Sequence, residues 1–145
     1  MKDGGRWLPG VFAAIFDDQG RLLCVRHNYG DGRWSLPGGG IEDGETVVAG
    51  LRREVREETG LEVEPDRLIT SYSRPEPGRQ SVLIRCKVTG GKLIASNSEI
   101  SEVRFFACDE LPDTFGPAGR MGTRDAFSGE FGFVRTFNPE SGEYE

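Results

Sequence analysis

The amino-acid sequence predicts an α/β fold in which one amphipathic helix packs against a mixed sheet, all within a single domain. The chain has 145 residues, a length typical of one domain. Residues 46–59 have the apolar spacing of a helix, and segments rich in β-branched and aromatic residues come before and after it. The composition, 36% hydrophobic and 29% charged, is that of an ordinary globular protein.

The first predicted strands are residues 11–16 and 21–26. Between them lies Asp-Asp-Gln-Gly, a turn-rich tetrapeptide, so we expect the two strands to form a hairpin. Residues 28–34 are too rich in glycine for regular structure and are expected to form a loop that leads Trp34 towards a run of three glycines at residues 38–40. Glycines there would let the backbone approach a ligand or a metal closely.

Residues 46–59 are predicted to form the main helix, which Gly60 ends. Four aliphatic residues fall within one third of its circumference and provide an apolar face: Val47, Val48, Leu51 and Val55. Gly50 lies inside this helix, where glycine is less favourable than alanine by about 1 kcal/mol. We therefore expect either close packing at Gly50 or a slightly looser helix.

After the helix, residues 67–74, 81–88 and 103–107 are each predicted as strands from their β-branched and aromatic content. A tight turn at residues 75–78 separates the first two, and a polar loop at residues 95–102 precedes the last. The sheet is therefore expected to be mixed, or antiparallel in part.

Residues 113–145 show little of the hydrophobic periodicity of helices or strands, because glycines recur through them. Only residues 120–127 are expected to form a short helix. No internal repeat, low-complexity tract or linker divides the chain. We therefore expect residues 1–145 to form a single domain, with residues 113–145 as a C-terminal extension.

Composition and charge weigh against several classes of protein. No apolar run approaches the ~20 residues of a membrane-spanning helix, and the N-terminus has no apolar segment of the kind found in a secretory signal. The net charge of −6 and the pI near 4.9 argue against a protein that wraps a nucleic-acid backbone with a broad basic surface. Cys24, Cys86 and Cys108 have no paired spacing and are expected to be reduced thiols in the cytoplasm.

Three glutamates, Glu54, Glu57 and Glu58, fall along one edge of the predicted helix, at about 100° per residue. Like charges at this spacing repel one another by about 0.2–0.5 kcal/mol per pair. A hard divalent cation that prefers oxygen ligands would turn this repulsion into coordination. A solvated acidic face is the alternative for the helix taken alone.

The spacing around these glutamates resembles a known motif. Gly39 is followed after five residues by Glu45 and, after seven more, by residues 53–61, Arg-Glu-Val-Arg-Glu-Glu-Thr-Gly-Leu. Residues 39–61 therefore resemble the Nudix box of the Nudix hydrolase (MutT-like) superfamily at every defined position, and Leu-Pro-Gly-Gly at residues 36–39 resembles its usual lead-in. The resemblance implies a Nudix-type α/β/α sandwich with a mixed central sheet.

The resemblance, which covers roughly residues 6–112, also implies a catalytic metal site. Divalent ions can activate water, polarise a phosphorus centre and offset the charge on a leaving phosphate. By similarity to the family, Glu57 and Glu58 are expected to hold Mg²⁺ or Mn²⁺, with Glu54 joining them directly or through water. The Gly38 backbone carbonyl is a candidate to complete the shell.

Arg53 and Glu45 look like the family's orienting ion pair, which would fix the rotamers of the carboxylates. Glu45 also fits a simpler role, as an acidic residue that stabilises the start of the helix. The general base is open between Glu99 and Glu102 of the polar loop, and each also fits a solvated loop acid. A carboxylate desolvated beside other carboxylates would titrate nearer working pH, and of the two we favour Glu99. His27, the only histidine, fits an edge residue better than a catalytic one.

Substrate recognition is expected to involve Arg26, which could reach a phosphate, and an aromatic side chain that stacks on a base. Trp34 is the first candidate for the aromatic, with Trp7 and Tyr72 as further options; each of these also fits a packing role. Pro77 lies sixteen residues beyond the box, where a proline resembles the ADP-ribose branch of the family, although any turn at this place would look similar.

The predicted function is metal-dependent hydrolysis of a phosphoanhydride bond in a nucleoside diphosphate linked to another moiety, with ADP-ribose or a nucleotide sugar favoured. The alternatives are a nucleoside triphosphate pyrophosphohydrolase and a non-catalytic nucleotide-binding module on the same fold; the intact glutamates weigh against the module. An isopentenyl-diphosphate isomerase would need a catalytic cysteine and a longer chain, and removal of messenger-RNA caps is disfavoured by the acidic charge. The expected partner is a small nucleotide-type molecule rather than a membrane or nucleic acid, and a homodimer is left open because many relatives are dimers.

Overall fold

The structure is a computed structural model that describes residues 2–145, with side chains described from residue 4 onwards. Met1, the first residue of the predicted domain, lies outside the described residues. The helices are α1 (Val47–Thr59) and α2 (Pro117–Ser128). The strands are β1 (Lys2–Asp3), β2 (Arg6–Trp7), β3 (Gly10–Ala14), β4 (Leu22–His27), β5 (Trp34–Ser35), β6 (Gly38–Gly40), β7 (Leu61–Ser73), β8 (Ser81–Gly91), β9 (Ile100–Phe106), β10 (Phe133–Asn138) and β11 (Glu143–Tyr144).

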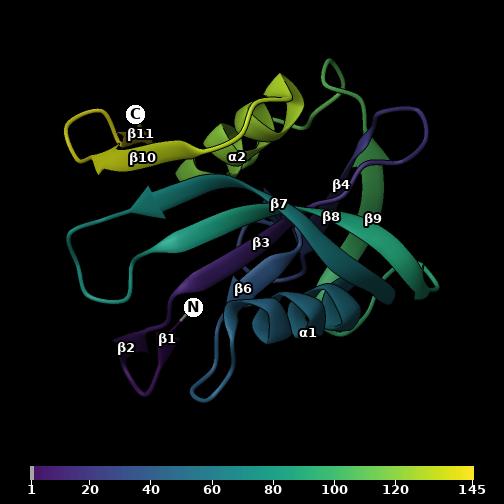
Figure 1. Ribbon diagram of the computed structural model, residues 1–145, viewed down its shortest axis with the longest axis horizontal. Coiled ribbons are helices and arrows are strands. Elements are labelled where there is room, and N and C mark those ends of the chain that lie inside the picture. The colour runs from purple at the N-terminus through teal and green to yellow at the C-terminus, as the bar shows by residue number, and fades with distance from the viewer. Residues whose placement is uncertain (1) are drawn as a thin grey trace.

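Six strands form a mixed central sheet in the order β11–β10–β7–β8–β3–β6. The long strands β7 and β8 pair antiparallel, whereas β3 runs parallel to β8 and β10 runs parallel to β7. Figure 1 shows α1 against one face of this sheet and α2 on the opposite side. The α/β/α sandwich with a mixed central sheet is therefore confirmed.

The hairpin predicted for residues 11–16 and 21–26 is wrong in its strand pairing. The chain does turn after β3, and Phe16 forms an isolated antiparallel bridge with Leu22. Beyond that bridge, β4 pairs with β5 and β9 in a separate three-stranded antiparallel sheet. β3 cannot pair with β4 along its length, since β6 and β8 already occupy its two edges.

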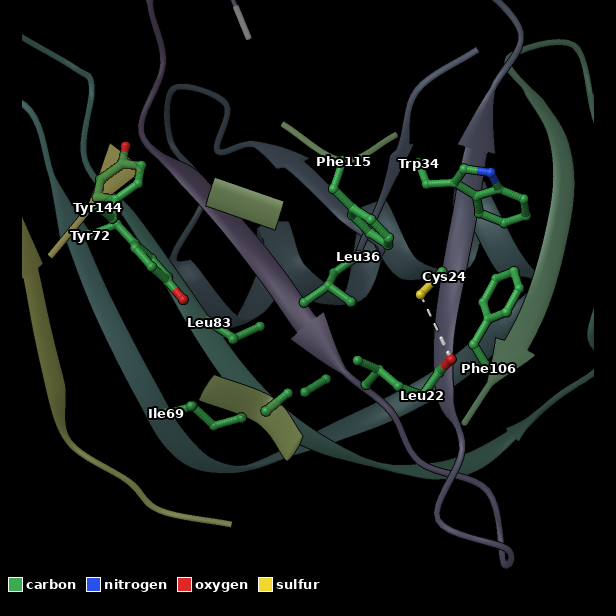
Figure 2. Packing of buried hydrophobic residues seen from close by; sticks show 12 residues of the cluster. Leu22, Cys24, Trp34, Leu36, Ile69, Tyr72, Leu83, Phe106, Phe115 and Tyr144 are labelled. Carbon is green, nitrogen blue, oxygen red and sulfur yellow. Dashed lines mark hydrogen bonds between the residues drawn. The ribbon is translucent and has the colours of Figure 1, made fainter. Parts of the chain in front are cut away.

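The core is divided between the two faces of the central sheet. Leu51 and Val55 of α1 have no exposed surface and pack in a cluster that includes Val11, Ala13, Ile15, Val63 and Ile84. The other cluster, rich in aromatic residues, is labelled in Figure 2: Leu22, Cys24, Trp34, Leu36, Ile69, Tyr72, Leu83, Phe106, Phe115 and Tyr144. Val47, predicted for the apolar face of α1, is instead 42% exposed at the first residue of the helix.

The ends of α1 agree with the prediction. The Thr46 hydroxyl accepts a hydrogen bond from the Ala49 backbone N–H at 3.1 Å, which caps the N-terminus. Gly60 has a φ of 80° and its N–H donates to the Arg56 carbonyl, which ends the helix in the way that favours glycine. Gly50 is buried, and a methyl group there would lie 3.3 Å from Glu45 Oε1. The close packing expected at Gly50 is therefore present.

The strands after α1 differ in length from the predictions. β7 starts at Leu61, directly after α1, rather than at Arg67, and β8 continues to Gly91 rather than ending at Val88. Shifts in the β7–β8 register after Glu62 and near Pro65 break the simple alternation that would have revealed the extra length. β9 spans Ile100–Phe106 rather than residues 103–107, so the last three residues of the predicted polar loop, 100–102, belong to this strand.

The C-terminal extension contains more regular structure than predicted. α2 starts at Pro117, three residues before the predicted helix, and β10 and β11 follow it. The carboxylate of Asp125 in α2 is 1% exposed and accepts hydrogen bonds from Thr70 Oγ1 at 2.8 Å and Tyr72 OH at 3.0 Å. Arg135 of β10 completes this buried network, with Nη2 2.6 Å from Asp125 Oδ1. These contacts tie α2 and β10 to β7.

The three cysteines are free thiols: Cys24 and Cys86 are buried, and Cys108 is exposed. Burial raises the pKa of both buried thiols to about 12. In the described part of the chain, neither helix has the length and apolar character needed to cross a membrane.

Candidate active site

A cavity of about 740 Å³ lies between α1, the central sheet and the first half of α2. Its volume is within the usual range of small-molecule sites. Carboxylates line one part of its wall, from Glu54, Glu58 and Glu99. Aromatic and aliphatic side chains line much of the rest: Trp7, Leu8, Phe12, Trp34, Leu36, Tyr72, Leu83 and Tyr144. The cavity therefore combines a charged region with surfaces that suit a ring or a sugar.

Glu58 is a buried carboxylate on this wall, only 6% exposed. Its Oε1 accepts a hydrogen bond from the Gly38 backbone N–H at 2.8 Å. Burial raises the pKa of Glu58 to about 8; the charges of Glu54, Glu99 and Glu57 add to that shift, and the Gly38 hydrogen bond opposes it. Without a cation nearby, Glu58 is therefore largely protonated at neutral pH.

Glu54 lies one turn earlier on α1 with its carboxyl group against the glycine strand β6. Burial raises the pKa of Glu54, the Arg53 guanidinium opposes this, and the charges of Glu57 and Glu99 reinforce it. A methyl group at Gly39 would lie 2.7 Å from the Glu54 carboxyl carbon. Glycine at this position is therefore what allows the Glu54 carboxylate to lie against the backbone of β6.

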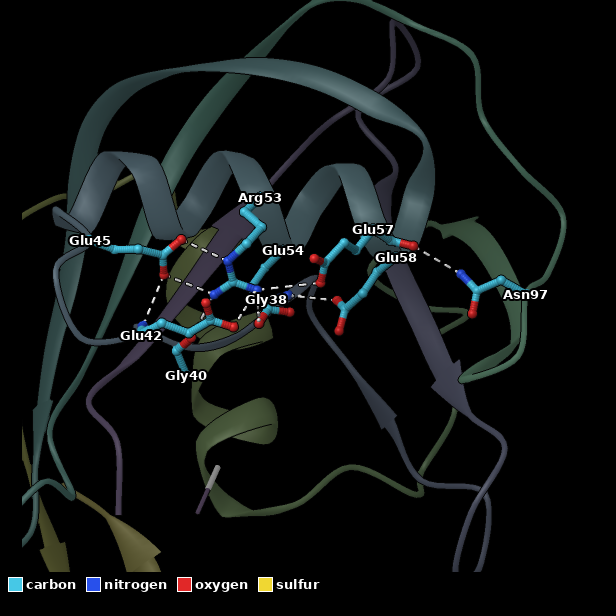
Figure 3. A network of polar contacts seen from close by, with 9 residues as sticks. All are labelled: Gly38, Gly40, Glu42, Glu45, Arg53, Glu54, Glu57, Glu58 and Asn97. Carbon is cyan, nitrogen blue, oxygen red and sulfur yellow. Dashed lines mark hydrogen bonds and ion pairs between the residues drawn. The ribbon is translucent and has the colours of Figure 1, made fainter. Parts of the chain in front are cut away.

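Arg53 connects the carboxylates on the exposed edge of α1 (Figure 3). Its Nε lies 2.7 Å and its Nη2 2.9 Å from the two oxygens of Glu45, so the expected Arg53–Glu45 ion pair is present. Nη1 lies 3.0 Å from Glu54 Oε1 and 3.3 Å from Glu57 Oε2, and Nη2 also donates to the Gly40 carbonyl. Hydrogen bonding from Arg53 lowers the pKa of Glu45 to about 2.

Glu99 lines the cavity from the loop between β8 and β9, where its charge acts on Glu54 and Glu58. Asn97 holds this loop, since its Oδ1 accepts from the Glu99 N–H at 2.8 Å and its Nδ2 donates to the Glu57 carbonyl at 3.0 Å. Figure 3 shows Asn97 reaching α1 in this way. Sequence reasoning missed Asn97; the signal was the Ser-Asn-Ser-Glu stretch, because asparagine side chains commonly bond backbone two residues on.

Glu102 and Arg26 are not among the cavity's lining residues. Glu102 lies on β9, with Oε1 3.4 Å from Arg26 Nη1 and Oε2 3.3 Å from Arg104 Nη2. Arg26 Nε donates to the Gly32 carbonyl at 3.0 Å. The structure therefore brings Glu99 to the acidic wall and directs Glu102 and Arg26 towards each other.

Trp34 serves both as a core residue and as part of the cavity wall. It is 5% exposed and packs edge-on against Phe106, with ring centroids 5.0 Å apart. Tyr72 also lines the cavity while its hydroxyl donates to Asp125. His27 lines the cavity with Nε2 2.9 Å from Ser35 Oγ; burial lowers the pKa of His27 and the charge of Glu99 opposes this.

The acidic wall fits a divalent cation by its chemistry. Within residues 2–145, no three His, Cys, Asp or Glu side chains already converge as a metal site, and Arg53 bridges Glu54 and Glu57 instead. The carboxylates are nevertheless close enough that the charges of Glu54 and Glu57 raise the pKa of Glu58. They are oxygen donors, which Mg²⁺ and Mn²⁺ prefer, and a cation among them would remove this repulsion.

The acidic wall, α1 and the glycine strand lie inside a segment that matches a known family. A model of the NUDIX domain matches residues 6–125. The chain belongs to the NUDIX domain family. It is therefore a Nudix-type hydrolase that acts on acid anhydrides, and such enzymes generally use divalent metal ions and small nucleotide-type substrates. The match ends within α2, so β10 and β11 lie outside it.

Individual relatives agree with this assignment. A MutT-like protein of Streptomyces ambofaciens is 35% identical over 126 residues, which is 87% of this chain and 80% of that protein. The crystal structure of an ADP-ribose pyrophosphatase from Streptococcus suis has a TM-score of 0.73 at 29% identity, covering 87% of this chain and 96% of that one. A UDP-X diphosphatase structure has a TM-score of 0.71 at 25% identity, covering 92% of this chain and 69% of that one.

This Nudix hydrolase spans less than half the length of several other curated relatives that it matches. One is the NAD-capped RNA hydrolase NudC of Stutzerimonas stutzeri, which is 30% identical over 107 residues, or 74% of this chain and 39% of that protein. The similarity to these proteins therefore covers only part of each of them.

Proposed function

We propose that this Nudix hydrolase uses Mg²⁺ or Mn²⁺ to hydrolyse a phosphoanhydride bond in a nucleoside diphosphate linked to another moiety, with ADP-ribose or a nucleotide sugar favoured. The observation that carries the proposal is the buried Glu58 carboxylate beside Glu54 and Glu99 on the wall of a 740 Å³ cavity. The names of two similar structures, an ADP-ribose pyrophosphatase and a UDP-X diphosphatase, support this substrate class.

Glu54, Glu57 and Glu58 are the proposed metal ligands, and the Gly38 carbonyl is the proposed backbone ligand. When bound, the ion would lower the pKa of a water molecule and offset charge on the phosphate oxygens. The Gly38 N–H, 2.8 Å from Glu58 Oε1, supports this assignment because it orients one carboxylate towards the glycine strand. Arg53 orients the other two through its contacts with Glu54 and Glu57.

Glu99 is the proposed general base, which would accept a proton from the attacking water. It lines the cavity with Glu54 and Glu58, and Asn97 holds its backbone. Trp34 is proposed to contact the ring or sugar of the substrate from the cavity wall. For Arg26 we now propose an indirect role, because its guanidinium holds the loop that carries Gly32 beside the cavity.

A substrate screen with Mg²⁺ tests this function. ADP-ribose, UDP-glucose, dinucleoside polyphosphates and nucleoside triphosphates should be compared by kcat/KM, with a chelator as the blank. We expect the first two to be hydrolysed fastest and the chelator to abolish turnover. We also expect Glu57→Gln to lower kcat by at least about 100-fold while unfolding is unchanged, because Glu57 is exposed and the loss would be in the chemistry.

Two results would contradict the proposal. If turnover persists in the presence of the chelator or in Glu57→Gln, the proposed catalytic role of the metal ion is wrong. A clear preference for nucleoside triphosphates would replace the substrate class with that of a triphosphate pyrophosphohydrolase.

A further inference from the structure

One region of the cavity wall carries arginines rather than carboxylates. We call it the arginine subsite and define it by its lining residues: Arg74, Arg79, Gln80, Ser81 and Tyr144. Each of these side chains offers at least one hydrogen-bond donor. The protein as a whole has a net charge of −6, so a cationic region inside its cavity runs against the overall charge.

Arg74 supplies a donor that has no acceptor. Its Cζ lies 3.8 Å from the centroid of the Phe137 ring, so the guanidinium packs over a residue of β10. Among the described residues, Arg74 Nε is the one buried side-chain nitrogen or oxygen without a hydrogen-bond partner. A buried donor in this state is unfavourable unless a ligand or water supplies an acceptor.

The ion pair between Arg74 and Glu76 is long and partly exposed to solvent. Glu76 Oε2 lies 3.7 Å from Arg74 Nε, which is longer than a hydrogen bond, and 47% of the Glu76 side chain is exposed. A solvent-exposed pair of this length contributes little and is easily exchanged. Glu76 is therefore positioned as a replaceable counter-ion for Arg74.

Arg79 and Tyr144 converge on the same place. The Arg79 guanidinium lies over the Trp7 ring, with Cζ 3.7 Å from the centroid. Burial raises the pKa of Tyr144, and the positive charges of Arg74 and Arg79 oppose this shift. Since Tyr144 belongs to β11, part of the subsite comes from outside the segment that matches the NUDIX domain.

The strand register separates the subsite from the acidic wall. Gly38, which contacts Glu58, lies in one row with Phe12, Leu83 and Thr70 across β6, β3, β8 and β7. Arg74 is four residues beyond Thr70 along the chain, which at 3.3 Å per residue is about 13 Å along the strand direction. A phosphate group at Glu58 therefore cannot also accept from Arg74, so Arg74 would contact another part of the substrate.

We propose that the arginine subsite binds an anionic group, a phosphate or a carboxylate, that the substrate carries away from the hydrolysed anhydride. The incoming anion accepts from Arg74 Nε and displaces Glu76. This inference rests on the proposed function and deepens it: among nucleoside diphosphate derivatives, those with an additional negative charge away from the anhydride are preferred.

Two matched ligand pairs test the proposal and distinguish the source of the anion. Adenosine 2′,5′-bisphosphate and AMP differ by a phosphate on the ribose, and UDP-glucuronate and UDP-glucose differ by a carboxylate on the linked sugar. Dissociation constants are measured by calorimetry for the first pair, which contains no anhydride and so reports binding even if hydrolysis fails. The ratio of kcat/KM is measured for the second pair. We expect the more anionic member of at least one pair to be preferred by about tenfold or more, as one charge-assisted hydrogen bond provides.

Three variants assign the preference to the subsite. Arg74→Met keeps a long side chain on Phe137 and is expected to abolish the preference, whereas Glu76→Gln removes the competing carboxylate and is expected to increase it. Arg67→Met is the matched control, because Arg67 lies on β7, the strand that ends just before Arg74, and stacks on Phe131 at 4.3 Å but does not line the cavity. It should leave the preference unchanged.

Opposite effects of Arg74→Met and Glu76→Gln on the preference for the more anionic ligand would support the proposal. If the two residues had only a structural role, both variants would change this preference in the same direction. Equal values within both ligand pairs, or a preference that survives in Arg74→Met, would overturn it. If the wild-type protein hydrolyses neither UDP-glucose nor ADP-ribose but still binds adenosine 2′,5′-bisphosphate more tightly than AMP, the proposed function is removed and the anion site is retained.

Discussion

The guanidinium of Arg53 donates two hydrogen bonds to the carboxylate of Glu45: Nε lies 2.7 Å from Oε2, and Nη2 lies 2.9 Å from Oε1. The remaining nitrogen, Nη1, contacts Glu54 and Glu57. Arg53 therefore holds two proposed metal ligands, of which Glu54 lines the cavity and Glu57 does not, and it is itself anchored to the carboxylate of Glu45. The planar fork of arginine makes this possible, and lysine cannot reproduce it.

Replacing Arg53 by lysine or Glu45 by glutamine should lower metal affinity or kcat by about 10–100-fold, the usual effect of removing a group that orients metal ligands. Turnover against Mg²⁺ concentration measures both quantities. Arg52→Lys is the control, because Arg52 contacts Glu64 and the Val63 carbonyl instead. An Arg53→Lys variant with wild-type kinetics would show that the contacts of Arg53 have no orienting role.

The stability of the metal-free protein should fall as the pH rises from about 4.5 to 8, because burial raises the pKa of Glu58 to about 8. In this window the folded protein keeps a proton that the unfolded chain has lost, so ionisation favours unfolding, by an amount on the order of a few kcal/mol across the range. Chemical denaturation in a chelator at several pH values measures this slope. Adding Mg²⁺ should raise stability most at the alkaline end, where the carboxylates are charged.

Glu58→Gln should remove most of that slope, since a neutral amide can still accept from the Gly38 N–H. A smaller slope of the same sign should remain from Glu54, whose pKa is also raised by burial. Glu57→Gln is the comparison variant and should reduce the slope far less, because the charge of Glu57 is the smallest of the effects that raise the pKa of Glu58. A Glu58→Gln variant with an unchanged slope would show that Glu58 is already ionised in the folded protein.

Glu99→Gln should lower kcat by about 10²–10⁴-fold, the usual contribution of a general base. Glu102→Gln should change it little, because Glu102 is paired with Arg26 and Arg104 away from the cavity. Asn97→Ala should reduce kcat without changing the chemistry of Glu99, since it only releases the loop. Steady-state kinetics of the three variants rank these effects, and equal losses for Glu99→Gln and Glu102→Gln would count against this assignment.

Gly39→Ala should reduce activity with little change in stability. Its methyl group would meet the Glu54 carboxyl group at 2.7 Å, and the flexible end of that side chain can move away. We expect kcat to fall about tenfold or more through the displaced ligand, with the free energy of unfolding changing by no more than about 1 kcal/mol.

Gly38→Ala provides the contrast. Its φ is 154° and its methyl group would lie 2.1 Å from the Val11 carbonyl oxygen, which is backbone and cannot move aside. This variant should lose at least about 1–3 kcal/mol of stability. If Gly39→Ala were destabilised as strongly, the close approach of Glu54 would not be the reason for that glycine.

The main helix and its acidic edge could be predicted because their signals are local. Thr46 and Gly60 mark the two ends of α1 within its own sequence, and the spacing of Glu54, Glu57 and Glu58 sets their common edge. The Arg53–Glu45 pair follows from the same short motif. Burial of Glu58 could not be read from spacing alone, because it depends on the approach of β6 from outside the helix.

The remaining differences involve pairings between distant segments. β10 pairs in parallel with β7, more than sixty residues earlier in the chain, and nothing in its own sequence signals that partner. Arg26 looked able to reach a phosphate, yet Glu102, on the neighbouring strand β9, lies within reach of its guanidinium. Asn97 positions a proposed catalytic loop through a backbone carbonyl of α1, a contact that no residue pattern specifies.

The three thiols differ so much in exposure that the protein provides its own labelling position. Cys24 and Cys86 are buried with pKa values raised to about 12, which leaves almost no reactive thiolate at neutral pH, whereas Cys108 is exposed and does not line the cavity. A maleimide dye added to the folded chain should therefore attach at Cys108. Ligand-induced motion could then be followed by fluorescence without substituting any cysteine.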